Sequence, residues 1–379
     1  MREKQPNDTN IKKLINTGTI DPYTSFWGAV KTQYIKDQYN EPIVENNALS
    51  SLYPTRFSEA SSSKIIIGGM TKDIEAYYDS DGSYLAGKST TIITSDKYNL
   101  KPLTALLNSS VCTFIAKDHK GMELAGGYLK IGPPLIKDIP VASGLLIEKD
   151  QENELTKIVD ELEMLNSNKI KFEKIWKEWC KKLSVKGKDL FSILDDDHTE
   201  ISRGKDDDAW FKDAKYYPST GKAELEKEYD EFNFDIDFGD QKIIFTDSSM
   251  TEIFFIKFKD LESLSHIYLS LIETKESGKR VSSLKELLEK TTIPLVTPNY
   301  NKNTKNIVAK TIADFQNIKD NNSPDNIIEI INKIKELSAE ADYKIITLYD
   351  LDKEQASTVL DSMSVTNNYK LKILNKFNS

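Results

Sequence analysis

The stretch KIIIGGMTKDIEAYYDSDGSYLAGKSTTII, residues 64–93, holds several short β-rich runs separated by glycine turns. Lys64–Ile67 is a β-branched run that ends at Gly68-Gly69, and Ile74–Tyr78 leads into Asp79–Gly82, where an Asp-Gly pair signals a hairpin. Thr90–Thr94 continues the strand-like pattern. The stretch therefore predicts a small sheet with tight turns and a hairpin at Asp79–Gly82.

The flanking sequence extends this pattern on both sides. Upstream, INTGTIDPYTSFWG (residues 15–28) is again rich in turn and strand residues. Downstream, Leu103–Ala116 carries apolar residues at helical spacing, and Tyr128–Ile131 after Gly126-Gly127 indicates a turn followed by a strand. We expect Pro133-Pro134 to prevent further regular structure.

A long helix is predicted at Glu152–Leu183, because apolar residues recur there at three- and four-residue steps without Pro or Gly. We expect this helix to pack on its own domain; a partner-docking or coiled-coil helix is the alternative. Apolar and polar residues alternate at 233–258, which predicts hairpin strands. Shorter elements are expected beyond them: helices at 261–273, 282–290, 307–315 and 325–340, and a strand at 293–296.

These stretches, with LTALLNSSVCTFIAKDHKGMELAGGYLKIGPPLIKDIPV (residues 103–141), closely resemble the TaqI-like C-terminal specificity domain. That domain is the target-recognition half of type II DNA adenine methyltransferases and of fused restriction–methylation enzymes. The likeness covers residues 14–182. It extends more loosely to the C-terminal end, where Ala341-Asp342 and Leu348–Leu351 resemble the closing element of the family.

The patterns and the resemblance together imply an α+β protein. We expect a mixed, mostly-β target-recognition domain, then a long amphipathic helix and a second α+β domain. The expected boundaries divide the chain into a DNA target-recognition domain at 1–145, a connecting helix at 146–190, an acidic accessory segment at 191–325 and a C-terminal helical element at 326–379.

Net charge permits DNA binding without arguing for it. The chain carries a formal net charge of −9, yet residues 1–150 hold equal numbers of acidic and basic residues, so the whole excess lies in 151–379. A neutral domain can bind DNA if its cations share one face, because affinity follows phosphate contacts. The acidic half would then face away from the duplex.

No catalytic motif of an adenine methyltransferase is visible. Such an enzyme needs a glycine-rich turn for S-adenosylmethionine and an Asn/Asp-Pro-Pro-aromatic loop for the flipped adenine. Here Pro133-Pro134 has neither an acid before it nor an aromatic after it, and Thr297–Tyr300 has a different order. The resemblance thus implies a partner, a catalytic domain or subunit that binds S-adenosylmethionine. Because Met1 lies just before the specificity segment, this chain is expected to be a separate subunit, a split gene or a truncated piece. Whether it takes part in an enzyme stays open.

Turn residues beside cations are the candidates for contact with double-stranded DNA. Phosphate contacts fix the register and side chains in the major groove read base edges. Gly68-Gly69 and Gly87 are expected to admit close backbone approach and to leave amides free for phosphates. The candidates are Arg56, Lys64, Thr71, Lys72, Lys88, Ser89 and Thr90, with Lys117, His119 and Lys120 as a second cationic loop.

Each candidate also has an ordinary structural interpretation. Lys72 and Lys88 fit solvated hairpin tips equally well, and Lys117–Lys120 fits a helix C-terminus where cations are favoured. We interpret Tyr23, Trp27 and Tyr128 as core or sheet-face aromatics and not as side chains that insert between bases.

The sequence predicts a cytoplasmic location. The first residues lack a secretory signal, no apolar run could span a bilayer, and two distant cysteines fit a reduced protein.

Neither a metal site nor a nuclease site is expected. The acidic runs Asp195–Asp197 and Asp206–Asp208 are interpreted as solvated loops. The alternative function is an acidic interaction protein that mimics DNA and inhibits a restriction system; a nuclease is disfavoured because no Asp…Glu-x-Lys arrangement occurs.

Overall fold

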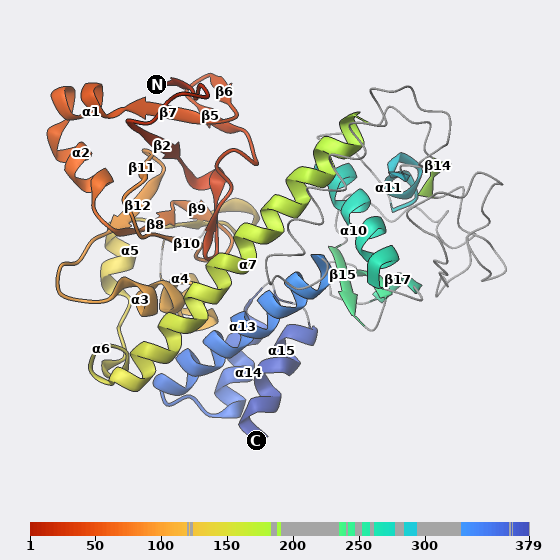
Figure 1. Cartoon of the computed structure of the whole chain (residues 1–379). Coiled ribbons are helices and arrows are strands. Elements are labelled where there is room, and N and C mark those ends of the chain that lie inside the picture. Colours follow the sequence, from red (N-terminus) through yellow and green to blue (C-terminus); the bar gives the residue numbers. More distant parts are fainter. Residues whose placement is uncertain are drawn as a thin grey trace. The chain divides into compact units, whose positions relative to one another are not determined.

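The protein forms two compact units, which are considered separately (Figure 1). The first contains Met1–Ile170 and Lys333–Ser379, and the second contains Lys171–Asn332. The structure is a computed structural model that describes residues 1–119, 121, 124–182, 188–190, 235–239, 242–246, 252–257, 261–276, 284–293, 327–363, 365 and 367–378. Helices and several small sheets give the expected α+β class. The four-segment division of the chain stays a prediction.

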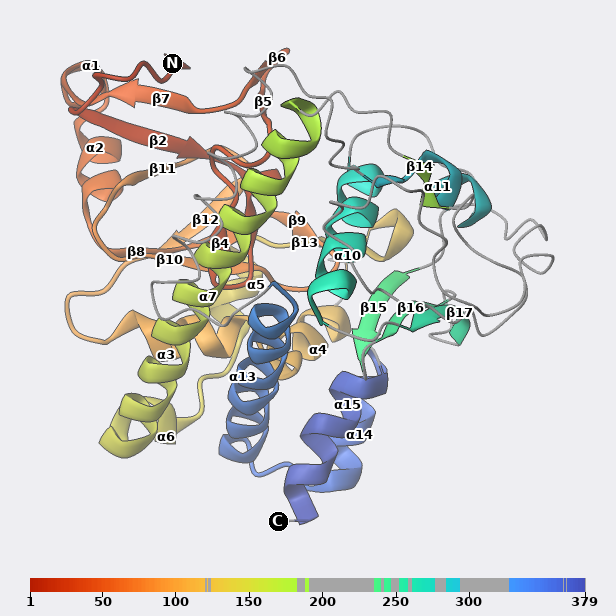
Figure 2. The same ribbon diagram turned by 45° about the vertical axis from the view of Figure 1, so that its right-hand side comes forward.

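Two sheets form the larger β part of the first unit (Figures 1 and 2). One has the order β1-β7-β2-β11, in which β11 is parallel to β2, and the other is the antiparallel sheet β10-β8-β12. The strands are β1 (Arg2–Glu3), β2 (Ile11–Ile15), β7 (Pro42–Glu45), β8 (Lys64–Gly68), β10 (Ala76–Asp79), β11 (Tyr84–Ala86) and β12 (Thr90–Ile93).

Three two-stranded ribbons extend from these sheets. They pair β3 (Ile20–Asp21) with β4 (Thr24–Ser25), β5 (Thr32–Tyr34) with β6 (Asp37–Tyr39), and β9 (Met70–Thr71) with β13 (Leu129–Lys130).

The central strand β8 is buried on both faces, which explains its continuous β-branched run. Successive side chains of a strand point to opposite faces. Ile65 and Ile67 therefore enter the main core, whereas Ile66 packs with Ile15 and Ile20 on the other side.

Helices of the first unit come from both ends of its sequence. The N-terminal part supplies η1 (Thr17–Thr19), α1 (Asn46–Leu52), α2 (Pro54–Ser61), α3 (Leu100–Leu107), α4 (Ser110–Asp118), η2 (Ala125–Gly127), α5 (Pro133–Asp138), α6 (Ser143–Ile147) and the start of α7 (Lys149–Lys182). The C-terminal part supplies most of α13 (Ile327–Leu348), then α14 (Lys353–Asp361), α15 (Asn367–Leu374) and η3 (Asn375–Asn378).

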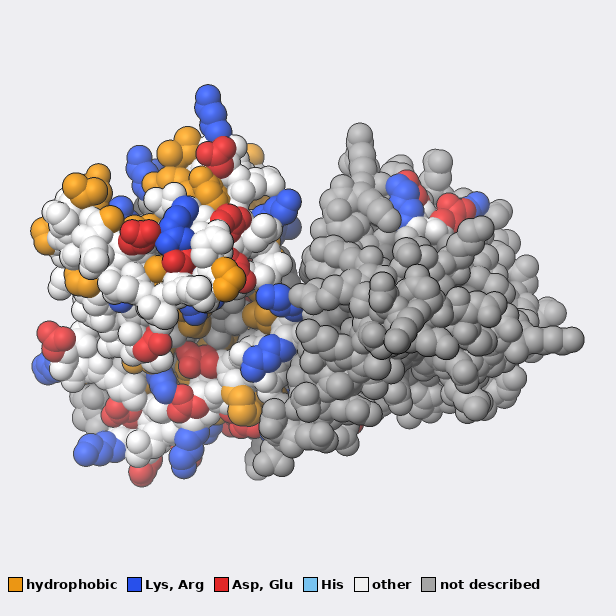
Figure 3. Space-filling model, turned by 45° about the horizontal axis from the view of Figure 1, so that its top comes forward, with side chains coloured by type: hydrophobic (Ala, Val, Ile, Leu, Met, Phe, Trp, Pro, Cys, Tyr) orange, Lys and Arg blue, Asp and Glu red, His pale blue; other side chains and the backbone are white. Residues whose placement is uncertain are grey.

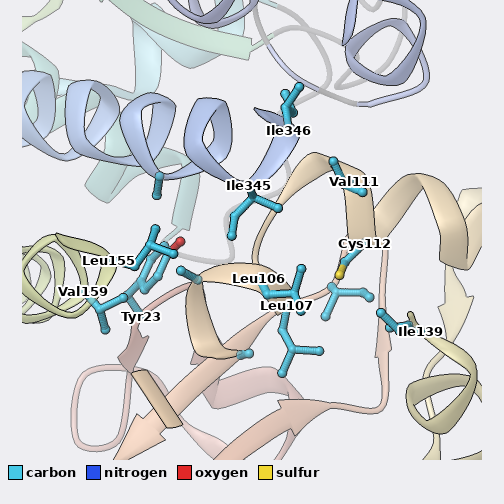
Figure 4. Packing of buried hydrophobic residues seen from close by; sticks show 14 of the residues in the cluster. Tyr23, Leu106, Leu107, Val111, Cys112, Ile139, Leu155, Val159, Ile345 and Ile346 are labelled. Carbon is cyan, nitrogen blue, oxygen red and sulfur yellow. The ribbon is translucent and has the colours of Figure 1, made fainter. Parts of the chain in front are cut away.

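The main hydrophobic core joins segments that lie far apart in the sequence (Figure 4). Side chains of β8, α3 and α4 meet Leu155 and Val159 of α7 and Ile345 and Ile346 of α13. The predicted helical stripe is confirmed from Leu155 to Phe172, since its apolar members are buried. Tyr23 is also part of this core, as expected.

Two polar contacts attach the C-terminal helices to the rest of the first unit. The buried carboxylate of Asp342 accepts from the backbone amide and the hydroxyl of Ser110, at 2.9 and 2.8 Å, at the start of α4. The hydroxyl of Tyr349 donates to the carbonyl of Pro140. Both residues belong to the stretch that resembles the closing element of the family.

The second unit contains the strands expected at 233–258. They are β15 (Asp235–Gly239), β16 (Lys242–Thr246) and β17 (Glu252–Lys257), paired antiparallel in that order. The helices α10 (Leu261–Glu276) and α11 (Leu284–Lys290) also agree with the sequence, and β14 (Lys188–Asp189) pairs with β18 (Thr292–Ile293). The helix expected at 307–315 and the two acidic runs lie outside the described residues.

The hairpin predicted at Asp79–Gly82 is wrong. β10 pairs with β8 and β11 pairs with β2, so the chain crosses from one sheet to the other at this turn. The Asp79 carboxylate accepts from the amides of Ser83 and Tyr84, while the carbonyl of Gly82 accepts from Lys12. These bonds direct the strand after the turn away from its predecessor.

Pro133-Pro134 does not end regular structure, contrary to expectation, because the two prolines open helix α5. The first turn of a helix has amides without intrahelical partners, so a residue that lacks an N–H fits there. Elsewhere, none of the described helices is long and apolar enough to cross a membrane.

Candidate nucleic-acid interface

Three turns of the first unit meet around Gly69, and we call this meeting point the Gly69 junction. The amide of Gly69 donates to the carbonyl of Ser89 at 2.9 Å, and its carbonyl accepts from the amide of Ile131 at 2.9 Å. The hydroxyl of Thr17 also donates to the Ser89 carbonyl. A Cβ on Gly69 would lie 2.4 Å from the Ser89 oxygen, so only glycine permits this approach. The junction joins residues 69–72, 87–90 and 128–131.

Three exposed lysines are carried by these turns. Lys72 and Lys88 were expected from the sequence, and Lys130 of β13 is added by the pairing of β13 with β9. None of the three has a charged partner among the described residues. Sequence reasoning missed Lys130, although the Gly126-Gly127 turn before a predicted strand was the available signal.

Arg56 lies beside the Lys88 turn. It is exposed on α2, and its Nη2 donates to the carbonyl of Ala86 at 2.9 Å. A hollow of about 200 Å³ separates α2 from the turn, lined among others by Arg56, Glu59, Lys88 and Thr90. Two solvent-facing cations and one carboxylate therefore border this hollow.

Lys64 does not belong to the interface. Its side chain is fully buried, where the ammonium forms an ion pair with Asp79 and donates to the carbonyls of Ala60 and Ser62. Burial lowers the pKa of Lys64 and raises that of Asp79, and their pairing opposes both shifts. A phosphate cannot reach an ammonium enclosed in this way, so the sequence-based assignment of Lys64 to DNA binding is wrong.

The hydroxyl candidates serve mainly inside the domain. Buried Thr71 donates to the carbonyl of Asp73, and Thr90 donates to the carbonyl of Gly87 at 2.7 Å. Ser89 is exposed, and its Oγ accepts from the amide of Thr17 at 3.3 Å. Ser89 is therefore the most exposed of these three, and Thr90 is half-buried.

The glycine amides are not free donors, contrary to expectation. Those of Gly68, Gly69 and Gly87 donate to the carbonyls of Glu75, Ser89 and Ile15. The glycines do admit close backbone approach, but the approaching chain is the protein's own.

The second cationic loop is largely neutralised. Lys117 pairs with Asp73 at 3.1 Å and donates to the carbonyl of Ser362, and His119 lies 3.1 Å from the Asp138 carboxylate. Lys120 lies outside the described residues. Lys117 thus links α4 to the neighbour of Lys72 and to the C-terminal helices.

The described residues on the face of the first unit in Figure 3 form no continuous basic patch. Figure 3 shows one face on which basic, acidic and apolar side chains are interspersed over the described residues. Close to the junction, burial raises the pKa of Glu75 to about 8, and the carboxylates of Asp21 and Asp73 add to this shift. Near neutral pH, Glu75 is therefore mostly uncharged and does little to oppose the junction lysines.

Residues 11–141 match the family model of the TaqI-like C-terminal specificity domain. The match includes the whole Gly69 junction and every strand of the two larger sheets except β1. It agrees with the resemblance seen in the sequence. No match to the chain was found among curated proteins.

The TaqI-like segment does not contain the whole core of its unit. Helix α7 and helices α13–α15 lie outside the match, yet they supply buried residues such as Leu155, Leu162, Ile345 and Leu360. The unit that carries the junction is therefore completed by sequence on both sides of the second unit.

The three aromatic residues differ in their surroundings. Tyr23 is buried, and the indole N–H of Trp27 donates to the carbonyl of Pro42 at 2.9 Å, as expected of structural side chains. Tyr128 instead is 42% exposed and Met70, opposite Lys130, is 55% exposed. The edge of the Gly69 junction therefore presents apolar surface next to its lysines.

Proposed function

We propose that this chain recognises duplex DNA and directs a site-specific adenine methyltransferase, or a fused methyltransferase–endonuclease, of a restriction–modification system. The match of residues 11–141 to a specificity domain carries this proposal. The exposed lysines of the Gly69 junction supply the cations that phosphate contacts require. The proposal also locates the chain in the cytoplasm, with its DNA.

Two kinds of groups at the junction would contribute differently to DNA recognition: cations would contact phosphates, and other polar or amphipathic side chains would contact the groove. Lys72, Lys88, Lys130 and Arg56 would contact phosphates and fix the register of the domain on the duplex. Ser89 and the amphipathic Tyr128 lie next to them and would meet the groove. The chemistry itself would be performed by a catalytic partner that binds S-adenosylmethionine and flips the adenine.

Binding to duplex DNA at several salt concentrations tests the proposal. Replacing Lys72, Lys88 and Lys130 by Ala should reduce the slope of log affinity against log salt by about 0.9 for each phosphate that is no longer neutralised. Lys157→Ala is the matched control, since Lys157 is exposed on α7 outside the TaqI-like segment. If a lysine contacts a guanine edge instead, affinity should fall by about 1–3 kcal/mol and only on one sequence.

The outcomes separate the proposal from its alternative. No salt-dependent binding by the parent chain would contradict DNA recognition. Inhibition of a restriction enzyme by a chain that does not bind DNA would favour an acidic DNA mimic, which the −9 charge of the sequence suggests.

The catalytic partner is tested separately by calorimetry with S-adenosylmethionine. The sequence has no glycine-rich cofactor loop or Pro-Pro-aromatic loop, so titration into this chain should release no binding heat. Micromolar affinity would contradict the assignment of the cofactor to a partner.

A further inference from the structure

The ribbon β5–β6 carries an exposed, strained isoleucine at its tip. Tyr34 pairs with Asp37, so Ile35 and Lys36 form a two-residue turn. Ile35 is 80% exposed and has a φ of 59°. A β-branched residue in the left-handed region is a genuine outlier, because its Cβ branches crowd the backbone there. Gly or Asn would satisfy this turn without that strain.

The ribbon rises from the same segment as the Gly69 junction. The side-chain amide of Asn16 donates to the carbonyl of Gln33 at 2.7 Å, and Thr32 at the base of the ribbon is fully buried. The next residue, Thr17, bonds to Ser89 and Gly69. The base of the ribbon is therefore fixed next to the turn that carries Lys88, while its tip extends into solvent (β5 and β6 in Figure 2).

The groups around Ile35 suit a nucleic acid. Lys31 and Lys36 are exposed, and no described residue forms an ion pair with either. Gln33 and Gln38 lie directly opposite each other, both exposed, so they share one face of the ribbon. The acidic Asp37 belongs to the other face, opposite Tyr34. Amides that can bond base edges thus lie between two cations and below an apolar tip.

We propose that the β5–β6 ribbon enters a DNA groove and inserts Ile35 as a wedge against a base step, with Lys31 and Lys36 on the flanking phosphates. The inference rests on the proposed function, since it assigns a second contact to the same recognition unit. Apolar wedges of this kind partly unstack a base step and kink the duplex, and the protein then contacts more of the bent DNA. The backbone strain at Ile35 persists because the insertion requires an apolar side chain at the tip.

The test uses the full chain and a mixed-sequence duplex with 2-aminopurine at pyrimidine–purine steps, which unstack most readily. The parent chain should raise 2-aminopurine fluorescence on binding. Ile35→Asn and Ile35→Gly both tolerate the positive φ, so the variants should fold with a Tm equal to or above that of the parent. They should lack the fluorescence increase and bind about tenfold more weakly, which corresponds to 1.4 kcal/mol.

Two controls make the result specific. Lys36→Ala should lower the salt slope by about 0.9, whereas the Ile35 variants should leave it unchanged, because isoleucine neutralises no phosphate. Leu371→Asn replaces another exposed apolar side chain, on α15, and should change neither fluorescence nor affinity.

The wedge and the proposed function fail in different ways. An equal fluorescence increase in the parent and the Ile35 variants would overturn the wedge and leave DNA recognition standing. Absence of duplex binding by the parent would overturn both.

Discussion

At the residue scale, three lysines that the sequence made candidates for phosphate contacts have different surroundings in the structure. Lys64 follows a serine run and begins a strand, whereas Lys72 and Lys88 follow turns, and all three were candidates for phosphate contacts. The structure buries Lys64 against Asp79 and leaves the other two exposed. What separates them is an acidic partner fifteen residues away on the neighbouring strand, which no local pattern reveals.

The buried pair should be essential for stability. Lys64→Met leaves the Asp79 carboxylate buried without its cation, and removing one member of such a pair costs about 3–5 kcal/mol. Lys72→Met, at an exposed site, should change the free energy of unfolding by less than about 0.5 kcal/mol. Urea denaturation of both variants measures the difference. Similar stabilities would mean that Lys64 is solvated in solution.

At the element scale, the Gly69 junction holds three separate turns in register. Its bonds join backbone groups and the side chains of Thr17 and Ser89, and no lysine side chain takes part. The lysines can therefore change without moving the turns. The position that cannot change is Gly69, where the carbonyl of Ser89 occupies the space of a side chain.

Gly69→Ala should therefore disturb structure and binding together. The new Cβ would meet a backbone oxygen, so the turns must shift, at a cost of roughly 1–3 kcal/mol. Gly18→Ala is a matched control, because the nearest atom to its added Cβ is 3.9 Å away. The free energy of unfolding and the affinity for duplex DNA should both fall in Gly69→Ala. Both should remain near the parental values in Gly18→Ala. If Gly69→Ala binds duplex DNA as tightly as the parent chain, the Gly69 junction does not contact DNA.

At the whole-molecule scale, the first unit is discontinuous in sequence. Residues 333–379 contribute buried side chains to the core that β8 and α3 share. The carboxylate of Asp342 also accepts from the amide of Ser110 at the start of α4. A segment defined by the family match alone would leave this core open.

Truncation tests this dependence. A fragment of residues 1–182 lacks α13–α15 and should unfold without a cooperative transition, because Leu106, Val111 and their neighbours would be without the helices that cover them. Calorimetry of the fragment and the full chain measures the effect. A sharp transition in the fragment would show that the C-terminal helices are dispensable for folding.

The contact between Asp342 and Ser110 predicts that the free energy of unfolding depends on pH. Burial raises the pKa of Asp342 to about 6, and its bonds to Ser110 reduce the shift. In the unfolded chain this group has a pKa of about 3.9. Its contribution to the free energy of unfolding, up to roughly 3 kcal/mol, is therefore fully present below about pH 4 and is lost as pH rises through about 6. Asp342→Asn does not titrate, and the difference in unfolding free energy between parent and variant should change across this window. A constant difference would contradict burial of the carboxylate.

The sequence by itself determined the kinds of most elements and the resemblance to the TaqI-like specificity domain, which the family match over residues 11–141 supports. Local periodicity predicted the long helix, the three strands of the second unit and the helices after them, because burial of one face imposes a period of 3.6 or 2 on apolar residues. Glycine turns with lysines indicated the position of the candidate interface. These features depend on residues that are close in sequence.

Only the tertiary structure decided which strands pair, which lysines face solvent and which segments complete the core. The turn at Asp79–Gly82 joins two sheets and does not close a hairpin. Lys130 lies at the Gly69 junction because β13 pairs with β9, and Ile345 packs in the same core as Tyr23. Each of these outcomes depends on a partner far away in the chain. Pairing and burial are set by the packing of the whole unit, so a local pattern does not encode them.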